Sequence, residues 1–286
     1  MSLWSKITQP RILKRIFYER LGEPLHLNLL SLGVMLLGSF RQKVNFDLVL
    51  RHHSAYGLLQ AADFAKSQGI AEIQALEFGV AAGAGLVNMA RIAQRVTKET
   101  GVRIKVTGFD TGKGMPAPID YRDHPDCYGP GDFPMDFAKL QAALPENTSL
   151  VLGELSETVP AWIKKNSAGA PIGYVVIDVD YYSSSVEALK ILEGPATSCL
   201  PVVIVYLDDI HYPVHNSWCG ELLAVQEFND RNKLRKIEKH AHLPYWRVFK
   251  RAPWLEHMFF LHVLDHPTRA KTDSSRAIAV LQNPFI

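Results

Sequence analysis

Residues 73–85 of the chain read IQALEFGVAAGAG, and this short stretch decides the fold. It begins as an apolar run typical of a buried strand and passes an acid at Glu77. Gly79, Gly83 and Gly85 then follow where a helix should open. Glycine at such a turn allows unusual backbone angles and lets a ligand approach bare amides at the helix N-terminus. The stretch therefore predicts a ligand-binding unit of strand, turn and helix, with glycines that serve only close packing as the alternative.

The alternation of short β-branched runs with longer helical stretches continues from residue 72 to residue 209. This pattern is typical of βαβ units and a parallel sheet. A helix over residues 220–231 and two last strands suggest a sheet that is closed by a hairpin. The sequence predicts an α/β fold with a doubly wound, mostly parallel seven-stranded sheet, Rossmann-like, and an N-terminal helical extension. We expect strands at residues 73–78, 104–109, 149–153, 174–179, 202–207, 236–242 and 258–264.

Helical patterns also precede the sheet, including YGLLQAADFAK over residues 56–66. We therefore divide the chain into an N-terminal helical extension over residues 1–69, a cofactor-binding domain over residues 70–267 and a polar C-terminal tail over residues 268–286. The sequence contains no internal repeat and no low-complexity segment.

Composition and charge limit the classes of protein that the chain can belong to. A length of 286 residues with 47% hydrophobic and 21% charged residues is ordinary for a globular chain with one sizeable core. A net charge of +2 gives no reason to expect a nucleic-acid partner. Three cysteines are too few and too irregularly spaced for a disulfide framework or a thiolate zinc site. With no signal peptide visible at the start, we expect a cytoplasmic protein.

The first 43 residues differ from the rest of the chain in charge and hydropathy. They carry seven Lys or Arg against two acids, a balance of +5, so the remainder sums to −3. Residues 25–40, LHLNLLSLGVMLLGSF, form a membrane-like run that falls short of the ~20 residues needed to span a bilayer. We expect a helix that is buried against the main domain or against a neighbouring subunit of a homo-oligomer. A helix lying on a membrane surface is the alternative.

The spacing of the glycine turn, G-x-x-x-G-x-G, distinguishes between two cofactor classes. It departs from the G-x-G-x-x-G of dinucleotide enzymes, in which the pyrophosphate sits on the helix dipole. A carboxylate at Glu77 would repel a pyrophosphate but can accept hydrogen bonds from a cationic, amino-acid-like ligand. Asp110 ends the second strand, where doubly wound nucleotide folds place an acid on ribose hydroxyls. These residues favour S-adenosylmethionine over NAD.

Acidic residues follow two neighbouring strands at the edge where doubly wound folds bind ligands. Asp178 and Asp180 end the fourth expected strand, and Asp208 and Asp209 end the fifth. Alternation along a strand puts Asp178 and Asp180 on the same side if strand geometry persists that far. Four close carboxylates repel one another unless some are protonated or a cation lies among them, and Mg²⁺ is the simplest such cation. The alternative is that these aspartates cap the helices that follow.

A metal and a base together suit methylation of an alcohol. A bound cation lowers the pKa of an oxygen that it coordinates, and a neighbouring carboxylate can take the proton. Asp180 is our candidate for this base. His211 is the second candidate for the base, because a lone histidine in a loop is more often only solvated or hydrogen-bonded.

Five ordered blocks, between about residues 74 and 230, resemble the macrocin O-methyltransferase family. The turn EFGVAAG at residues 77–83 is similar to the family's E-T-G-V-W-R-G, and DTGKGMPAP at 110–118 to its D-S-F-E-G-L-P-x-P. GELSETVP at 153–160 resembles G-W-F-x-D-T-L-P, and DVDYYSSS at 178–185 resembles D-x-D-L-Y-E-S-T. The acidic pair at 208–209 completes the series. Alanines replace the bulky Trp-Arg of the turn, and Glu-Leu replaces Trp-Phe near the expected adenine pocket.

This resemblance implies a Mg²⁺-dependent enzyme that methylates a sugar-like hydroxyl of a small acceptor with S-adenosylmethionine. It implies Asp180 as the general base. The expected metal ligands are Asp178, Asp208 and Asp209. The residues expected to bind the cofactor are Glu77, Gly79, Val80, Gly83, Gly85, Asp110, Glu154 and Asp178.

Two other functional classes fit the sequence. One is an α/β enzyme that uses NAD or a nucleotide. The other is a non-catalytic cofactor-binding module whose N-terminus binds a membrane or a partner protein. Under either enzymatic hypothesis, the Pro- and Gly-rich residues 116–134 form a loop that we expect to cover the cofactor or the acceptor, with Tyr121, His124 and Tyr128 as contacts. A plain surface loop is the alternative.

Overall fold

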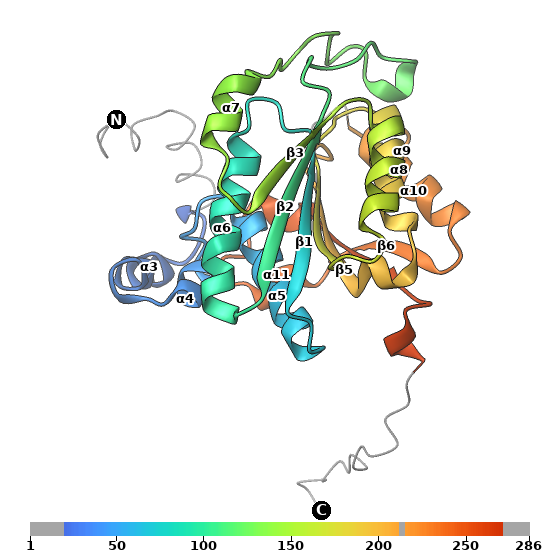
Figure 1. Ribbon diagram of the computed structural model, residues 1–286. Helices are drawn as coiled ribbons and strands as arrows, with labels where there is room; N and C mark the ends of the chain where they lie inside the picture. The colour runs from blue at the N-terminus through green and yellow to red at the C-terminus, as the bar shows by residue number, and fades with distance from the viewer. Residues whose placement is uncertain (1–19, 212–214, 271–286) are drawn as a thin grey trace, which may run out of the picture.

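The computed structural model describes residues 20–211 and 215–270 and is built around a seven-stranded sheet (Figure 1). The strand order is β3-β2-β1-β4-β5-β7-β6. The first five strands along the chain pair in parallel, whereas β7 runs antiparallel to both β5 and β6. The expected doubly wound, mostly parallel sheet with a closing hairpin is confirmed. The strands are β1 (Glu72–Phe78), β2 (Arg103–Asp110), β3 (Thr148–Leu152), β4 (Ile172–Ile177), β5 (Cys199–Leu207), β6 (Arg235–Lys239) and β7 (Met258–Val263).

The end of β4 differs from the sequence prediction. Strand geometry was expected to continue to residue 179, but β4 ends at Ile177. Asp180 then adopts φ +56°, a left-handed conformation in which the alternation of a strand is lost. The condition for placing Asp178 and Asp180 on one side by strand alternation is therefore not met, and a tight turn instead brings both to the wall of one pocket.

Helices cover both faces of the sheet (Figure 1). Buried residues of α5 (His52–Ser67) and α6 (Ala84–Thr100) form one core with the sheet, and those of α9 (Tyr182–Leu189) and α10 (Gly220–Arg231) form a second with the other face. α8 (Leu155–Asn166) joins this second layer. The predicted apolar stripe of α6 is confirmed, since all five of its members are buried: Leu86, Met89, Ala90, Ala93 and Val96.

The N-terminal extension is fastened to the C-terminal part of the chain. α4 (Phe40–Asn45) is followed by Asp47, whose carboxylate forms a buried ion pair with Arg247 at 2.6 Å. The same guanidinium donates to the carbonyl of Val44. Glu23 accepts the backbone N–H groups of residues 250 and 251. Two short helices lie later in the chain, α7 (Phe137–Ala143) and α11 (Leu243–Trp246).

The apolar run at residues 25–40 forms α3 (Leu25–Leu37), which lies at the margin of the molecule next to α4 (Figure 1). Ser31 is its single buried residue. Seven of its large apolar side chains are each more than half exposed: Leu25, Leu29, Leu30, Leu32, Met35, Leu36 and Leu37. The expectation that this helix is buried against the main domain is therefore wrong. None of the helices described here is both long and apolar enough to cross a bilayer.

Candidate functional site

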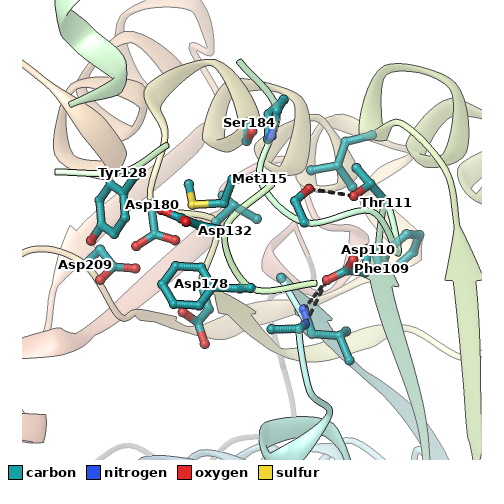
Figure 2. Close-up of a pocket in the computed structure, with 18 of the residues that line it drawn as sticks. Phe109, Asp110, Thr111, Met115, Tyr128, Asp132, Asp178, Asp180, Ser184 and Asp209 are labelled. Atoms are coloured by element: carbon teal, nitrogen blue, oxygen red, sulfur yellow. Dashed lines mark hydrogen bonds between the residues drawn. The ribbon is translucent and has the colours of Figure 1, made fainter. Parts of the chain in front are cut away.

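A pocket of about 1040 Å³ opens at the carboxyl ends of β1, β2, β4 and β5. Parallel strands of a doubly wound sheet place ligands at this edge. The pocket wall brings together most of the residues that the sequence singled out (Figure 2). They are Glu77, Gly79, Val80, Gly85, Asp110, Glu154, Asp178, Asp180, Asp208 and Asp209.

Two of the predicted residues lie elsewhere. Gly83 faces α7, because a Cβ there would come within 2.1 Å of a methyl group of Leu140. His211 is exposed, and its ring lies edge-on to His257 with 4.8 Å between the ring centroids. Neither residue forms part of the pocket wall.

The turn after β1 is shaped by two close approaches. Gly79 has φ +84°, and a Cβ there would lie 1.7 Å from the carbonyl oxygen of Asp178. A Cβ at Gly85 would lie 2.3 Å from Oε1 of Glu77. Gly79 therefore allows the turn to pack directly against the end of β4. Gly85 allows the first turn of α6 to pack against the side chain of Glu77.

Asp110 holds this turn from the end of β2. Its Oδ2 accepts the backbone N–H groups of Val80 and Ala81 at 2.8 and 2.9 Å, and its Oδ1 accepts that of Gly112 at 2.6 Å (Figure 2). Amides that are already bonded to a side chain cannot cradle a phosphate in the way of a dinucleotide-binding loop. A carboxylate oxygen has two acceptor positions, so Oδ1 keeps one for a further donor such as a hydroxyl.

Glu77 is 4% exposed and lies at the floor of the pocket. Burial raises the pKa of its carboxyl group to about 8, while the positive charge of Arg51 opposes that rise. Asp208 acts in the same direction as burial. Glu77 is therefore largely neutral near pH 7 in the free protein, and a cation above it would favour its ionisation.

Arg51 also lines the pocket, although no sequence motif predicts it there. It adopts φ +55° directly before α5 and lines the same wall as Glu77. It lowers the pKa of Glu77 and of Asp178 through its charge. No sequence pattern predicts this position, because Arg51 belongs to the N-terminal extension and lies outside every motif of the sheet. Tertiary packing alone brings it to the pocket.

Asp178, Asp208 and Asp209 form the acidic centre of the site. One carboxylate oxygen from each lies within 4.8 Å of the others. Burial, followed by the nearby charge of Asp208, raises the pKa of Asp178 well above its usual range. Burial and then Glu221 raise the pKa of Asp209 to about 11. Carboxyl groups held this close in a buried place are costly to ionise unless a cation is present.

Unsatisfied oxygens in this centre fit a hard divalent cation. Among the described residues, Oδ2 of Asp209 and Oε1 of Glu221 are buried without a hydrogen-bond partner. Mg²⁺ takes oxygen ligands from carboxylates and keeps several water molecules, so three close carboxylates and orphaned oxygens match its chemistry. The residues present therefore fit such an ion.

Glu221 is a second residue that sequence reasoning missed. It lies in the first turn of α10, is 1% exposed, and accepts the backbone N–H of Asp209 at 3.2 Å. Burial raises its pKa well above the usual range, and the charge of Asp178 adds to this. The acid directly after Gly220 is visible in the sequence. Acids are common in the first turn of helices, so its position alone does not indicate a functional residue.

Asp180 lies beside Asp209 in the wall of the pocket (Figure 2). The nearby hydroxyl of Tyr128 and the carboxyl group of Asp209 favour the charged form of Asp180. Burial outweighs both, so the pKa of Asp180 is raised. A carboxyl group with a raised pKa is a better proton acceptor once it is ionised, which suits a general base.

The loop over residues 116–134 covers the pocket. Ala117, Tyr128 and Phe133 contribute to its wall, which favours the covering role over a plain surface loop. Asp123, in the short helix η2 (Tyr121–Asp123), anchors the loop by accepting the backbone N–H and the hydroxyl of Ser183 at 2.8 and 2.9 Å. Tyr121 is 71% exposed and is not part of the wall.

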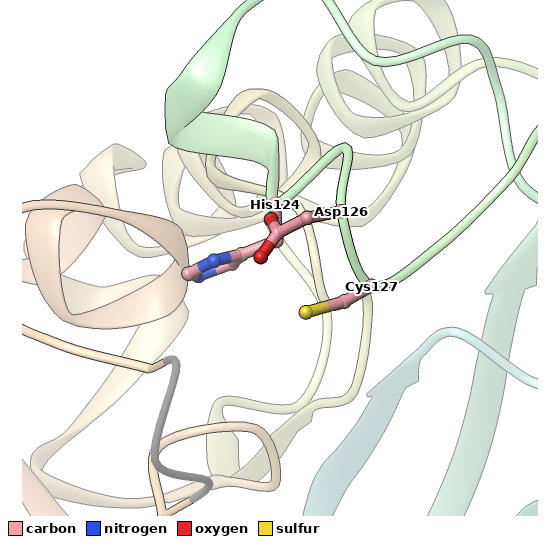
Figure 3. Close-up of side chains that lie close together, drawn as sticks. All are labelled: His124, Asp126 and Cys127. Carbon is pink, nitrogen blue, oxygen red and sulfur yellow. The ribbon is translucent and has the colours of Figure 1, made fainter.

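A second group of polar side chains lies on this loop. The ligand atoms of His124, Asp126 and Cys127 are within 4.8 Å of one another (Figure 3). Burial and then the charge of Asp126 raise the pKa of the Cys127 thiol. Because metals bind the thiolate and a raised pKa favours the neutral thiol, we assign no metal to this group.

Comparisons with known proteins give likenesses at the level of structure. No protein-family model and no curated protein matches the chain. The calicheamicin methyltransferase CalS11 is 22% identical, with 77% of this chain and 85% of that chain covered and a TM-score of 0.46. The O-methyltransferase NovP is 14% identical, with 74% and 79% covered and a TM-score of 0.49. An rRNA methylase from Streptococcus thermophilus is 12% identical, with 72% and 94% covered and a TM-score of 0.33. At such identities and scores, the function of this chain has to be argued from its own residues.

Proposed function

We propose that the protein is an S-adenosylmethionine-dependent O-methyltransferase that uses a divalent cation and acts on a small, polyhydroxylated, sugar-like acceptor. One observation carries the proposal: a single pocket joins a glycine turn that is closed to phosphate with a centre of half-buried carboxylates. The first feature suits a cationic nucleoside, and the second suits a metal beside a hydroxyl.

Charge supports S-adenosylmethionine over a dinucleotide. S-adenosylmethionine carries a sulfonium and an ammonium group, whereas the pyrophosphate of NAD is anionic. Glu77 and Asp178, both with raised pKa, lie in the wall where the ligand would sit and favour a positive neighbour. Asp110 offers its free acceptor position to ribose hydroxyls, and Glu154 lies on the wall beyond it. The glycines Gly79 and Gly85 leave room for the ligand against the turn.

The cation would be held by Asp178, Asp208 and Asp209, and Mg²⁺ is the ion that their chemistry favours. When bound, it supplies positive charge that lowers the pKa of a nearby hydroxyl. Asp180 then accepts the hydroxyl proton, as the acceptor oxygen forms a bond to the methyl carbon and the bond from that carbon to sulfur breaks. The hydroxyl of Tyr128 lies near Asp180 and favours its charged form.

The acceptor side of the pocket supports a polyhydroxylated substrate. Asp132, Asp180 and Ser184 offer oxygens to this space, and Tyr128 adds a hydroxyl and a ring face (Figure 2). Carboxylates accept hydrogen bonds from hydroxyl donors, which a sugar ring presents on several sides. The covering loop would exclude water from the reaction.

Calorimetry on the full chain tests the cofactor class. S-adenosylmethionine should bind, and NAD should neither bind nor compete at the same concentration. Tighter binding of NAD would establish the alternative of a nucleotide-using enzyme. Transfer of labelled methyl groups to a panel of glycosides, with and without Mg²⁺, then tests the reaction. Cofactor binding without transfer to any acceptor would favour the alternative of a non-catalytic module.

A further inference from the structure

The arrangement of side chains on α3 is inverted relative to an ordinary surface helix. Two of its three polar residues face the rest of the chain, although His26 is exposed: Ser31 is buried, and Asn28 donates to the backbone carbonyl of Arg20 at 2.8 Å. The large apolar side chains point outward, seven of them more than half exposed. A surface helix normally presents its polar face to water. A contiguous apolar surface of this kind marks a site of interaction.

Basic residues outnumber acids along the segment that contains α3. No acidic residue occurs between Glu23 and Asp47. Glu23 is 9% exposed and bonded to backbone N–H groups, and Asp47 is paired with Arg247 in the interior. Arg41 is ion-paired with Asp63 and Glu99, but residues 1–43 still carry a balance of +5 in sequence.

Two exposed aromatic side chains lie near the same part of the molecule. Tyr245 is 76% exposed and Trp246 is 80% exposed. The next residue, Arg247, donates to the carbonyls of Val44 and Asn45 at the end of α4, so α11 adjoins the N-terminal helices. Tyr and Trp are enriched where a protein meets the boundary between water and lipid.

We propose that α3 is a membrane-docking helix that lies in the boundary between headgroups and acyl chains of an anionic bilayer. Its outward leucines enter the acyl layer, and basic residues of the same segment, such as Lys43, contact the lipid phosphates. Thirteen residues are too few to span a bilayer but suit a helix lying in its plane. A second copy of the chain is the weaker occupant, because a symmetric contact would bring two positively charged segments together.

Sedimentation of the full-length protein with vesicles tests this docking. Vesicles of equal parts phosphatidylcholine and phosphatidylglycerol should bind the protein, and pure phosphatidylcholine should bind it more weakly. Raised salt should weaken the binding to the anionic vesicles, since screening reduces the attraction. A triple variant, Leu29→Gln, Leu32→Gln and Leu36→Gln, should lose about tenfold or more of the partitioning. All three positions are exposed, so the substitutions remove no core contact.

The control is a double variant at exposed leucines elsewhere, Leu234→Gln and Leu264→Gln, which should bind vesicles as the wild type does. Binding of S-adenosylmethionine should be the same in all variants, which separates this proposal from the proposed function. The proposal is overturned if wild-type protein does not bind anionic vesicles or if the triple variant binds them equally well. A wild-type dimer that the triple variant breaks, with no vesicle binding, would establish a second copy as the occupant.

Discussion

The two sides of the pocket differ in how far their polar groups are satisfied. On the cofactor side, Asp110 accepts three backbone N–H groups, and the turn is held without any ligand. On the acidic side, Asp209 and Glu221 each keep a buried oxygen without a partner, and their pKa values are raised. The comparison indicates that the cofactor side is built in advance, whereas the acidic side is completed by what it binds.

We expect the largest loss of activity from a substitution in the acidic centre. Asp178→Asn should lower methyl transfer by on the order of 10³-fold, because it removes a charge from the centre that would hold the cation. Metal-free variant protein should melt no lower than the wild type, since a repulsive charge is gone. Turnover assays and thermal melts measure both. Asp230→Asn, at an exposed acid on α10, is the control and should change neither. Full activity in Asp178→Asn would remove this residue from the centre.

A substitution at Asp110, on the proposed cofactor side, should instead lower the free energy of unfolding. Asp110→Ala leaves the N–H groups of Val80, Ala81 and Gly112 without their acceptor, at a cost of about 2–4 kcal/mol in the free energy of unfolding. Affinity for S-adenosylmethionine should fall as well. Denaturant melts and calorimetry provide the two measurements. Asp110→Asn keeps one acceptor oxygen and should fall between the wild type and the alanine variant. Unchanged stability in Asp110→Ala would contradict the idea of a turn built in advance.

The pH dependence of the free energy of unfolding tests the contribution of Glu77. Its pKa rises from 4.5 to about 8 on folding, so the folded state binds the proton more tightly than the unfolded state. The resulting stability is fully present below pH 4.5 and is lost as pH rises towards 8, with a slope of about 1 kcal/mol per pH unit at most. Denaturant melts across this range should show that Glu77→Gln flattens the slope. An equal slope in the variant would mean that other groups produce it.

The smallest effect is a thermal shift caused by the metal. Mg²⁺ should raise the melting temperature of the wild type by about 2–4 °C, because it binds the folded state alone. The shift should disappear in Asp208→Asn and persist in Asp230→Asn. Calorimetry of Mg²⁺ binding provides the same comparison without heating. A shift of the same size in Asp208→Asn would place the ion elsewhere.

The sequence predicted the sheet well because its signals are local. Short β-branched runs bounded by Gly, Pro or an acid marked the five parallel strands, and strand ends in a parallel sheet share one edge. The meeting of Glu77, Asp110, Asp178 and Asp208 followed from that topology alone.

Residues outside the local pattern were not predictable in the same way. Arg51 reaches the pocket from before α5, and Glu221 reaches the backbone of Asp209 from α10, each through packing that no motif encodes. The turn at Asp180 has a left-handed conformation that strand alternation does not anticipate. The inward polar face of α3 likewise depends on its contact with Arg20 rather than on its composition.

The ion pair between Asp47 and Arg247 sets the order in which the chain can assemble during synthesis. Its partners are 200 residues apart, so the N-terminal helices have to wait for the C-terminal segment before they can be fastened. At roughly 5–20 residues per second on the ribosome, that wait is about 10–40 s. For this period the leucines of α3 are available on a nascent chain whose sheet is unfinished. If α3 docks on a bilayer as proposed, this timing allows the contact to form before the sheet is complete.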